Sequence, residues 1–463
     1  MIRWERLNKD EIMKVLDDLS SNDHEIEGGR LFSHIYDPGI DELKEISISA
    51  YLKYIDKTML NFAIFPSILK MEREVIHIVK KLLNGGDEVA GNYTYGGTES
   101  IFLALKTARD YMKANRDITK PNIVIPYTGH PAFLKSADYL DIEVRYASLT
   151  DEYTVDVDDL NKKIDRHTIA IIGSAPNYPY GTIDNIKALS EIALEKDIWL
   201  HVDACIGGFV LPFLKDLGLD IPPYDFTLEG VSSISIDLHK YGYTPKGGSI
   251  ILYRNRGYRL HQIYINASWP GYPLVNTTVL SSRSAGPLAA AYTTLKYLGY
   301  RGYLELTKKI LEAKEEIMDG LERLGFRILG KPVSSIVTFT SDDIDLFILA
   351  EKMRSKGWYI QLQPGSLKMG FPPSIHLTIS PVHSVTSSEF IEDLKQVVEE
   401  VRDYHIEIPD EIPSLKNLDE LIELLGLKDL SFNRMDLVNR LIYMLPPEEV
   451  EKVFKEVINK IYP

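Results

Sequence analysis

One segment of the sequence places a lysine where carbonyl chemistry is possible. Residues 232–248 read SSISIDLHKYGYTPKGG, so Lys240 directly follows His239 in a Gly/Pro-containing loop after a β-rich run. A lysine at the end of a strand can form a Schiff base with an aldehyde cofactor, provided that its site lowers its pKa. Most single lysines are solvated surface charges, so this assignment depends on what the rest of the chain places beside Lys240.

An aspartate stands in a comparable position. Residues 201–205 read HVDAC and two glycines follow soon after, so Asp203 comes at the C-terminal end of an apolar run. Open α/β sheets bind their ligands at that end of the strands. An aspartate there can keep a pyridine nitrogen protonated, which makes pyridoxal phosphate an electron sink. A helix N-cap or another structural aspartate is the alternative interpretation.

Two further segments offer groups for an aromatic, phosphorylated ligand. Gly97 and Thr98, in GGTES at 96–100, precede a predicted helix, and glycines, hydroxyls and a helix N-terminus suit an anion. His130, in GHPAF at 129–133, follows a predicted strand, and its flat imidazole can stack on an aromatic ring. In isolation the first segment is equally consistent with an ordinary N-cap, and the second with a polar surface histidine.

The elements that must position these groups alternate between strands and helices from about residue 60 to 300. Helices are predicted over 99–114 and 185–194, and strands over 122–126, 142–147, 168–173, 198–202, 233–236 and 249–253. Several strands are apolar on both faces, which is typical of a sheet covered by helices on both sides. The alternation predicts an α/β fold with a mainly parallel, doubly wound sheet.

The chain divides into four predicted parts: a helical segment at 1–60, a large domain at 61–300, a small α+β domain at 301–405 and a helical extension at 406–463. The small domain combines helices near 301–324, 342–356 and 387–402 with strands near 336–340 and 375–379. In the extension, apolar residues recur at helical spacing: Leu418, Leu421, Ile422, Leu424 and Leu425. We expect this stripe to pack on the protein's own body or on a second subunit, with a foreign partner as the alternative.

Composition excludes several classes of function. The 463 residues include 52 Lys and Arg against 67 Asp and Glu, and the net charge of -15 repels phosphate backbones, so we expect no nucleic-acid partner. Cys205 is the single cysteine, which rules out an intrachain disulfide and favours a reducing compartment. No apolar run approaches the roughly 18 residues of a membrane span, and no signal-peptide pattern opens the sequence. We therefore expect a cytoplasmic protein with no membrane span and no metal site.

Taken together and in this order, the GGTES, GHPAF, HVDAC and DLHKYG segments resemble the fold-type-I pyridoxal-phosphate enzymes, and among them the group II amino-acid decarboxylase superfamily. Within that superfamily the chain is similar to the sphingosine-1-phosphate lyases. The similar segments are HVDACIGGF, SISIDLHKYGYTPKGGS, FPPSIHLTI at 371–379, and Trp269 with the later SSRSAG at 281–286. The likeness extends from about residue 50 to 405.

The resemblance implies a role for each matched residue. Lys240 would carry the cofactor, pyridoxal 5'-phosphate, as a Schiff base, Asp203 would pair with the pyridine nitrogen, and His130 would stack on the ring. Other matched residues would surround the cofactor: Gly97, Thr98 and His239 at its phosphate, Ser281 or Ser282 at the phosphate from a neighbouring subunit, and Ser174 and Asn177 beside the ring. The resemblance therefore also implies a homodimer.

The candidates for substrate binding, Lys246, Asn61 and His376, do not all favour one substrate. Lys246 stands where the resembled lyases use a second lysine for the substrate's own phosphate. Thr58 and Asn61 stand where those lyases have Asn and His near that phosphate, which is a departure from the family pattern. His376 lies in a predicted strand that has no Arg with which to grip an α-carboxylate, which weighs against transamination.

These observations predict a pyridoxal-phosphate-dependent carbon–carbon lyase that acts on an amine or amino-acid substrate. Lys246 and the FPPSIH segment favour retro-aldol cleavage of a phosphorylated amino alcohol, whereas the altered residues at 58–61 favour decarboxylation of an amino acid. A non-catalytic binding protein of the same fold is a third hypothesis, and the presence of Lys240, Asp203 and His130 argues against it.

Overall fold

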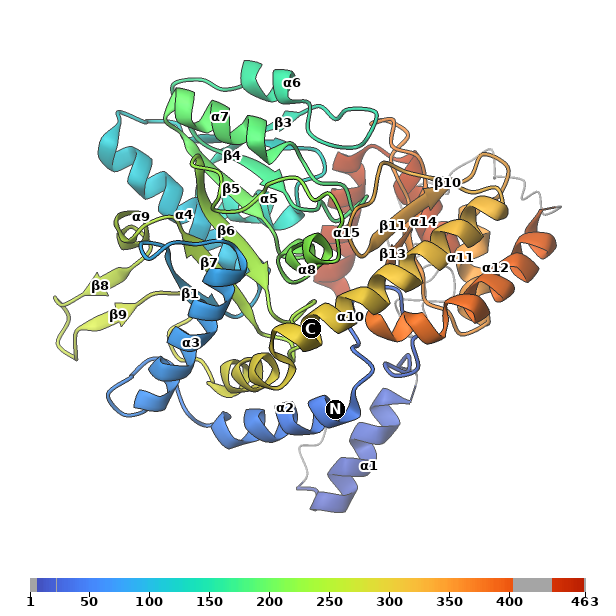
Figure 1. Cartoon of the computed structure of the whole chain (residues 1–463), viewed down its shortest axis with the longest axis horizontal. Coiled ribbons are helices and arrows are strands. Elements are labelled where there is room, and N and C mark those ends of the chain that lie inside the picture. The colour runs from blue at the N-terminus through green and yellow to red at the C-terminus, as the bar shows by residue number, and fades with distance from the viewer. Residues whose placement is uncertain (1–5, 22, 403–434, 462–463) are drawn as a thin grey trace.

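A seven-stranded sheet forms the centre of the protein in a computed structural model that describes residues 6–21, 23–402 and 435–461 (Figure 1). The strand order is β1-β7-β6-β5-β4-β2-β3. Strands β2 to β6 run parallel, and β7 runs antiparallel to both of its neighbours, β1 and β6. The strand bounds are β1 Ala90–Thr94, β2 Asn122–Pro126, β3 Glu143–Ala147, β4 Thr168–Ser174, β5 Trp199–Asp203, β6 Val231–Asp237 and β7 Ser249–Tyr253.

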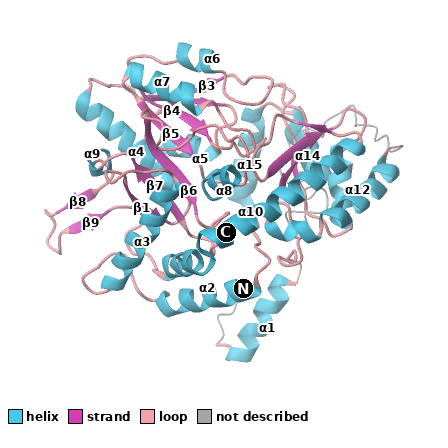
Figure 2. Cartoon of the chain, in the orientation of Figure 1, coloured by secondary structure: helices cyan, strands magenta, loops and turns pink. Residues whose placement is uncertain are grey.

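All six strands predicted for the large domain are present, with ends that differ from the prediction by at most two residues. Every residue of β2, β4, β5, β6 and β7 is buried, because helices cover the sheet (Figure 2). Helix α4 packs on β6 and β7, and α7 packs on β4 and β5. The large-domain helices after β1 are α4 Gly97–Asn115, α5 Pro131–Tyr139, α6 Val157–Lys162, α7 Ile186–Lys196, α8 Leu211–Asp216 and α9 Arg256–Leu260.

Strand β1 was not predicted, because its sequence, AGNYT, has no continuous apolar run. It forms through its pairing with β7, in which Gly91 lies opposite Leu252. A Cβ atom at Gly91 would lie only 2.1 Å from the carbonyl oxygen of Ile251, so this pairing requires glycine. The strand matters for function because its C-terminal end leads directly into Gly96 and Gly97.

Helix α10, Gly286–Arg323, consists of two helices joined at a kink, and the second agrees with the helix predicted near 301–324. The helix begins with Pro287 in its first turn, where the missing N–H costs nothing, and continues through an alanine-rich stretch. Gly299 has a φ of 55° and produces a kink within it. The helix therefore crosses the predicted domain boundary at residue 300 and joins the two domains (Figure 1).

The small domain contains a four-stranded antiparallel sheet in the order β10-β11-β13-β12. Its elements are β10 Arg327–Ile328, β11 Ile336–Thr340, α11 Leu346–Ser355, β12 Gln361–Gln363, β13 Ser374–Thr378 and α12 Ser387–Val401. The N-terminal segment joins this domain, because the N–H of Phe32 donates to the carbonyl of Tyr359 and the N–H of Thr378 donates to the carbonyl of Phe32. Helices α2, Asp41–Tyr54, and α3, Pro66–Leu82, then return the chain to α10 and the large domain.

The two ends of the chain differ in how they pack. Helix α1, Lys9–Ser20, has a capping box formed by Asn8 and Glu11, but none of its side chains is buried. Near the C-terminus, α14, Met435–Met444, packs on α11, and Arg440 donates to Asp345 at 2.6 Å. Helix α15, Pro447–Ile461, follows. The apolar stripe predicted over residues 418–425 lies outside the described residues, and no helix within the described ranges is long and apolar enough to cross a membrane.

Candidate active site

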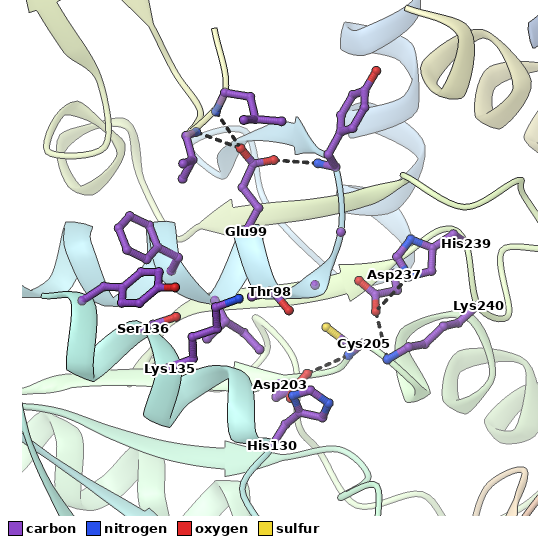
Figure 3. Close-up of a pocket in the computed structure, with 18 residues that line it drawn as sticks. Thr98, Glu99, His130, Lys135, Ser136, Asp203, Cys205, Asp237, His239 and Lys240 are labelled. Carbon is purple, nitrogen blue, oxygen red and sulfur yellow. Dashed lines mark hydrogen bonds and ion pairs between the residues drawn. The ribbon is translucent and has the colours of Figure 1, made fainter. Parts of the chain in front are cut away.

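A cavity of about 570 Å³ opens where the C-terminal ends of β5 and β6 meet the N-termini of α4 and α5 (Figure 3). Each strand delivers one polar group there, because the carboxyl ends of parallel strands lie along one edge of the sheet. Six of the predicted site residues line the cavity: Gly97, Thr98, His130, Asp203, His239 and Lys240. The fold thus brings together residues that are up to 143 positions apart between Gly97 and Lys240.

The first turn of α4 forms an anion-binding wall of the cavity. The N–H groups of Gly97 and Thr98 belong to the first turn, so they have no carbonyl partner within the helix and are available to an anion. A Cβ atom at Gly97 would lie 2.9 Å from both carboxylate oxygens of Asp237. Glycine is therefore required at position 97 if the helix is to start this close to the end of β6.

Asp203 ends β5 and is buried. Its Oδ1 accepts hydrogen bonds from the N–H of Cys205 at 3.0 Å and from the hydroxyl of Ser235 at 3.4 Å. These bonds fix the carboxylate at the strand end and orient it within the cavity (Figure 3). The carboxylate is thus placed to meet a cationic or protonated ring nitrogen.

His130 caps the N-terminus of α5, and Pro131 follows it in the first turn. Its Nδ1 accepts a hydrogen bond from the N–H of Ala132 at 3.1 Å, which leaves the proton of the neutral ring on Nε2. Burial, together with the charge of Lys240, lowers the pKa of His130. The ring is therefore neutral near pH 7, and its orientation is set by the helix cap.

Lys240 is held by a residue that the sequence analysis did not assign. Its Nζ lies 2.9 Å from Oδ2 of Asp237, and Nε2 of His239 lies 3.7 Å from the same oxygen. Asp237 is almost completely buried, and its Oδ1 has no hydrogen-bond partner among the described residues. The signal in the sequence was the carboxylate three positions before the lysine in DLHKYG.

The charge of Asp237 reverses the pKa expected for Lys240. Burial by itself lowers the pKa of Lys240, but the nearby carboxylate outweighs it, and the pKa stands well above its usual range. For Asp237, burial raises the pKa, while Lys240 and His239 lower it to below its usual range. In this arrangement Lys240 and Asp237 form a buried ion pair, so the lysine does not have the lowered pKa on which the Schiff-base role was conditional.

Lys246 meets the N-terminal segment rather than the cavity wall. Its Nζ donates to the carbonyl of His34 at 2.8 Å and lies 5.0 Å from the ring centroid of Tyr36. Among the described residues no carboxylate pairs with this ammonium group. Desolvation and the positive charge of Lys240 lower the pKa of Lys246. The charges of the two lysines therefore interact.

Ser174 and Asn177 lie outside the lining of the cavity. The N–H of Ser174 donates to Asp184, and the amide of Asn177 donates to the hydroxyl of Thr182 at 2.7 Å and to the carbonyl of Tyr153 at 3.1 Å. Asn177 thus holds a loop together in this structure. The role beside a ring that was expected for both residues stays a prediction.

Asn61 and His376 also lie outside the lining of the cavity. Asn61 is exposed, and its side chain accepts a hydrogen bond from the N–H of Ala63. His376 is fully buried in β13, bonds to Thr378 and stacks on Tyr178 with ring centroids 4.3 Å apart. Burial lowers the pKa of His376 to about 4, so its ring is neutral near pH 7. Their predicted contacts with a substrate are not tested by this geometry.

A family model described as "Pyridoxal-dependent decarboxylase conserved domain" matches residues 40–341, which is more than half of the chain. This chain belongs to the pyridoxal-dependent decarboxylase family. The match includes every cavity residue described above, so the shared region contains the whole of the site. The predicted fold, lyase class and cofactor are thereby confirmed.

Relatives within the family refine the comparison. The chain is 41% identical over 359 residues to a sphingosine-1-phosphate lyase of Oryza sativa subsp. japonica, covering 76% of this chain and 66% of the relative. It is 30% identical to the L-aspartate/L-glutamate decarboxylase of Pyrococcus horikoshii, covering 85% of this chain and 98% of the relative. The predicted resemblance to the sphingosine-1-phosphate lyases is therefore confirmed, while the chain spans about two thirds of the rice relative's length.

Solved structures show the same fold. The sphingosine-1-phosphate lyase of Burkholderia pseudomallei superimposes with a TM-score of 0.82 and 34% identity, covering 87% of this chain and 93% of that chain. The Lactobacillus brevis glutamate decarboxylase superimposes with a TM-score of 0.76 at 22% identity, covering 88% of this chain and 96% of that chain, and supports the fold alone. The chain is thus a pyridoxal-phosphate-dependent lyase of fold type I.

The residues of the cavity fit this cofactor. Lys240 would hold its aldehyde carbon and Asp203 its ring nitrogen, while the first turn of α4 at Gly97 and Thr98 would hold its phosphate. The fit rests on two observations. The space beside Gly97 is one that a Cβ would fill, and the lysine, aspartate and histidine converge on one cavity. When bound, the cofactor supplies a ring that accepts the electrons of a bond broken at the substrate's amine-bearing carbon.

Residues of the chain would orient the bound groups and transfer protons. The amine of Lys240 would carry protons in the cavity, and the carboxylate of Asp237, 2.9 Å from its Nζ, stabilises the protonated form. Neutral His130 closes one side of the site and keeps its Nε2 proton available as a donor. Asp203 is held at the strand end by its hydrogen bonds from Cys205 and Ser235, where it would face the cofactor's ring nitrogen.

Proposed function

We propose that the protein cleaves a phosphorylated amino alcohol by a retro-aldol reaction, giving an aldehyde and an amine phosphate. The bond between the amine-bearing carbon and the hydroxyl-bearing carbon breaks. One proton leaves the hydroxyl group, and one proton is delivered to the amine-bearing carbon. The sphingosine-1-phosphate lyases among the relatives support this reaction class, at 34–41% identity.

The observation that carries the proposal is the environment of Lys246. Its ammonium group is near enough to Lys240 for the two charges to interact, and its hydrogen bond goes to the neutral carbonyl of His34. A cation without a carboxylate partner among the described residues, beside the reactive lysine, suits an anionic group on the substrate. A substrate phosphate would accept charge-assisted hydrogen bonds from it.

A comparison of two lysines tests the proposal. Lys246→Gln should lower kcat/KM for the phosphorylated substrate by about tenfold or more, since one decade is about 1.4 kcal/mol, and should change the unphosphorylated analogue far less. The absorbance of the bound cofactor should stay unchanged, because Lys240 is retained. Lys135→Gln is the matched control, since Lys135 is also an exposed lysine and lines the cavity itself. A phosphate-specific loss in Lys135→Gln but not in Lys246→Gln would contradict the assignment.

Decarboxylation of an amino acid is the second candidate. The Pyrococcus horikoshii decarboxylase supports it, because 98% of that protein is matched. The segment at 58–61 supports it too, because Thr58 and Asn61 differ from the residues that the resembled lyases have near the substrate phosphate. The Asn61 side chain instead accepts a hydrogen bond from the N–H of Ala63. Incubation with a panel of amino acids and phosphorylated amino alcohols distinguishes the reactions, because one releases carbon dioxide and the other an aldehyde.

We also propose that the enzyme acts as a homodimer with Ser281 and Ser282 reaching the neighbouring site. Both serines are exposed, and they follow a loop that Glu99 fixes by accepting hydrogen bonds from the N–H groups of Val279 and Leu280. Sedimentation of the loaded enzyme should give a dimer. A folded and fully active monomer would contradict this part of the proposal.

A further inference from the structure

A second large cleft lies away from the active site, between α3, α9 and the start of β1. Its volume is about 850 Å³. Gly91 and Asn92 of β1 line it, whereas the other end of β1 leads to Gly96 and Gly97 at the active-site cavity. Asn92 of the cleft and Tyr95 of the cavity are three residues apart, roughly 10 Å at about 3.3 Å per residue, and the two linings share no residue. The cleft is therefore distinct from the cavity that holds the cofactor.

One face of α3 supplies a row of basic side chains to this cleft. Lys70, Arg73, His77 and Lys80 all line it, at a spacing of three, four and three residues that keeps them on one side of the helix. The row extends over about 15 Å, since each helical residue rises about 1.5 Å. Arg256 and Arg259 of α9 provide cations that line the same cleft.

The carboxylates of the cleft leave most of this positive charge unneutralised. Glu72 is buried and accepts from the amide of Asn92 and the N–H of Tyr93, while Glu74 pairs with Lys296 at 2.7 Å. Asp87 is the remaining acidic residue of the lining. Among the described residues, the side chains of four lining cations make no hydrogen bond or ion pair: Lys70, Arg73, Lys80 and Arg256.

Arg259 is fixed in the wall of the cleft by a hydrogen bond. Its Nε donates to the side-chain oxygen of Asn92 at 3.0 Å, which anchors the guanidinium group in the wall of the cleft. Burial is the main cause that lowers the pKa of Arg259, Glu72 raises it, and repulsion from the charge of Arg256 lowers it by a smaller amount. An anion placed between the two helices would relieve this repulsion.

We propose that this cleft binds a small ligand that carries two or more linked phosphate groups. The volume lies within the range of about 300–1,000 Å³ that is usual for small-molecule sites. Cations on two helices, spread over about 15 Å of α3, exceed the reach of a single phosphate and match an extended polyanion. The concentration of basic residues is notable in a chain whose net charge is -15.

Titration calorimetry with inorganic tripolyphosphate tests the proposal on the cofactor-loaded enzyme, in which the cofactor itself occupies the active-site phosphate position. The wild-type enzyme should bind one tripolyphosphate per chain. The double variant Arg73→Gln/Arg256→Gln should weaken binding by about tenfold or more, because one contact is lost from each wall. The matched control Lys309→Gln/Lys395→Gln removes the same charge from exposed positions on α10 and α12 and should change the affinity by about twofold or less.

Several outcomes would overturn the proposal. One is the absence of binding to the loaded enzyme, and another is an equal loss in the two double variants, which would show only a general charge effect. Binding confined to cofactor-free protein would place the probe in the active site. Dissociation of a wild-type dimer by Arg73→Gln/Arg256→Gln in sedimentation, without tripolyphosphate binding, would show that a second copy of the chain occupies the cleft. Lyase activity should be equal in both variants, because neither touches the active site.

Discussion

Replacement of Asp237 by asparagine should lower the pKa of Lys240 without changing the fold. The substitution keeps the shape and one acceptor oxygen of the side chain but removes the charge that lies 2.9 Å from Nζ. The structure gives a definite direction, because the carboxylate raises the lysine pKa against the effect of burial. The stabilising ion pair exists only where both groups are charged. It is lost as the pH falls through the lowered pKa of Asp237 or rises through the raised pKa of Lys240.

The size of the effect follows from the geometry. Two unit charges 2.9 Å apart attract by about 6 kcal/mol at an effective dielectric constant near 20. Desolvation offsets part of this energy, and asparagine still accepts a hydrogen bond. A net loss of about 1.5–3 kcal/mol is therefore expected, which corresponds to about 1–2 pKa units. Near neutral pH the unprotonated fraction of Lys240 should rise by about one to two decades.

Pulse acylation of the cofactor-free protein measures this shift. The rate at which Lys240 is labelled is followed by peptide mapping across a range of pH, in the wild type and in Asp237→Asn. The inflection for Lys240 should move to lower pH by about 1–2 units. Lys309, exposed on the surface of α10, is the internal comparator and should keep its profile. Superimposable Lys240 profiles in the two proteins would refute the conclusion that Asp237 sets the charge of the lysine.

Three further predictions concern the cofactor cradle, the pH dependence of stability and the C-terminal helices. Gly97→Ala should weaken cofactor binding by about tenfold or more, because the new Cβ would lie 2.9 Å from the oxygens of Asp237. Fluorescence titration measures the affinity for the cofactor. An unchanged affinity would contradict the conclusion that the site requires glycine at position 97. Burial lowers the pKa of His201 to about 4 in the folded protein. The free energy of unfolding should therefore decline by about 3 kcal/mol as the pH falls from about 6.5 to 4. Urea unfolding of His201→Gln should show a flatter pH dependence over that range. Arg440→Ala should cost about 1–3 kcal/mol of stability by removing the 2.6 Å bond to Asp345; a loss of unfolding free energy within error of zero would show that α14 does not depend on it.

Much of the large domain was predictable, because helix-covered parallel strands have a strong apolar signature. The strand at 122–126 was predicted with both of its ends, and β5 and β6 were predicted to within two residues. Two elements escaped prediction for local reasons. Strand β1 lacks an apolar run and depends on Gly91 for its close pairing with β7, and the part of α10 that precedes the non-helical Gly299 was not among the predicted helices.

The sequence by itself determined that Lys240, Asp203 and His130 meet at the active site, but it gave no role to Asp237 there. Lys240, Asp203 and His130 each follow a predicted strand, and the carboxyl ends of parallel strands must lie along one edge of a sheet. The order of the motifs resembles that of the fold-type-I pyridoxal-phosphate enzymes, and this resemblance predicted a pyridoxal-phosphate site. This inference needed no distance, because the topology of the fold supplies the convergence.

Only the tertiary structure decided how these groups are charged and which distant residues they meet. The charge on Lys240 depends on the 2.9 Å separation from Asp237 and on shared burial, and a sequence contains neither quantity. Lys246 is 212 positions from His34, whose carbonyl accepts its hydrogen bond, so no local pattern could have joined them. The basic cleft between α3 and α9 likewise exists because two helices far apart in sequence pack beside the same edge strand. Electrostatic interactions fall off steeply with distance and depend on burial, so they become defined only when the chain has folded.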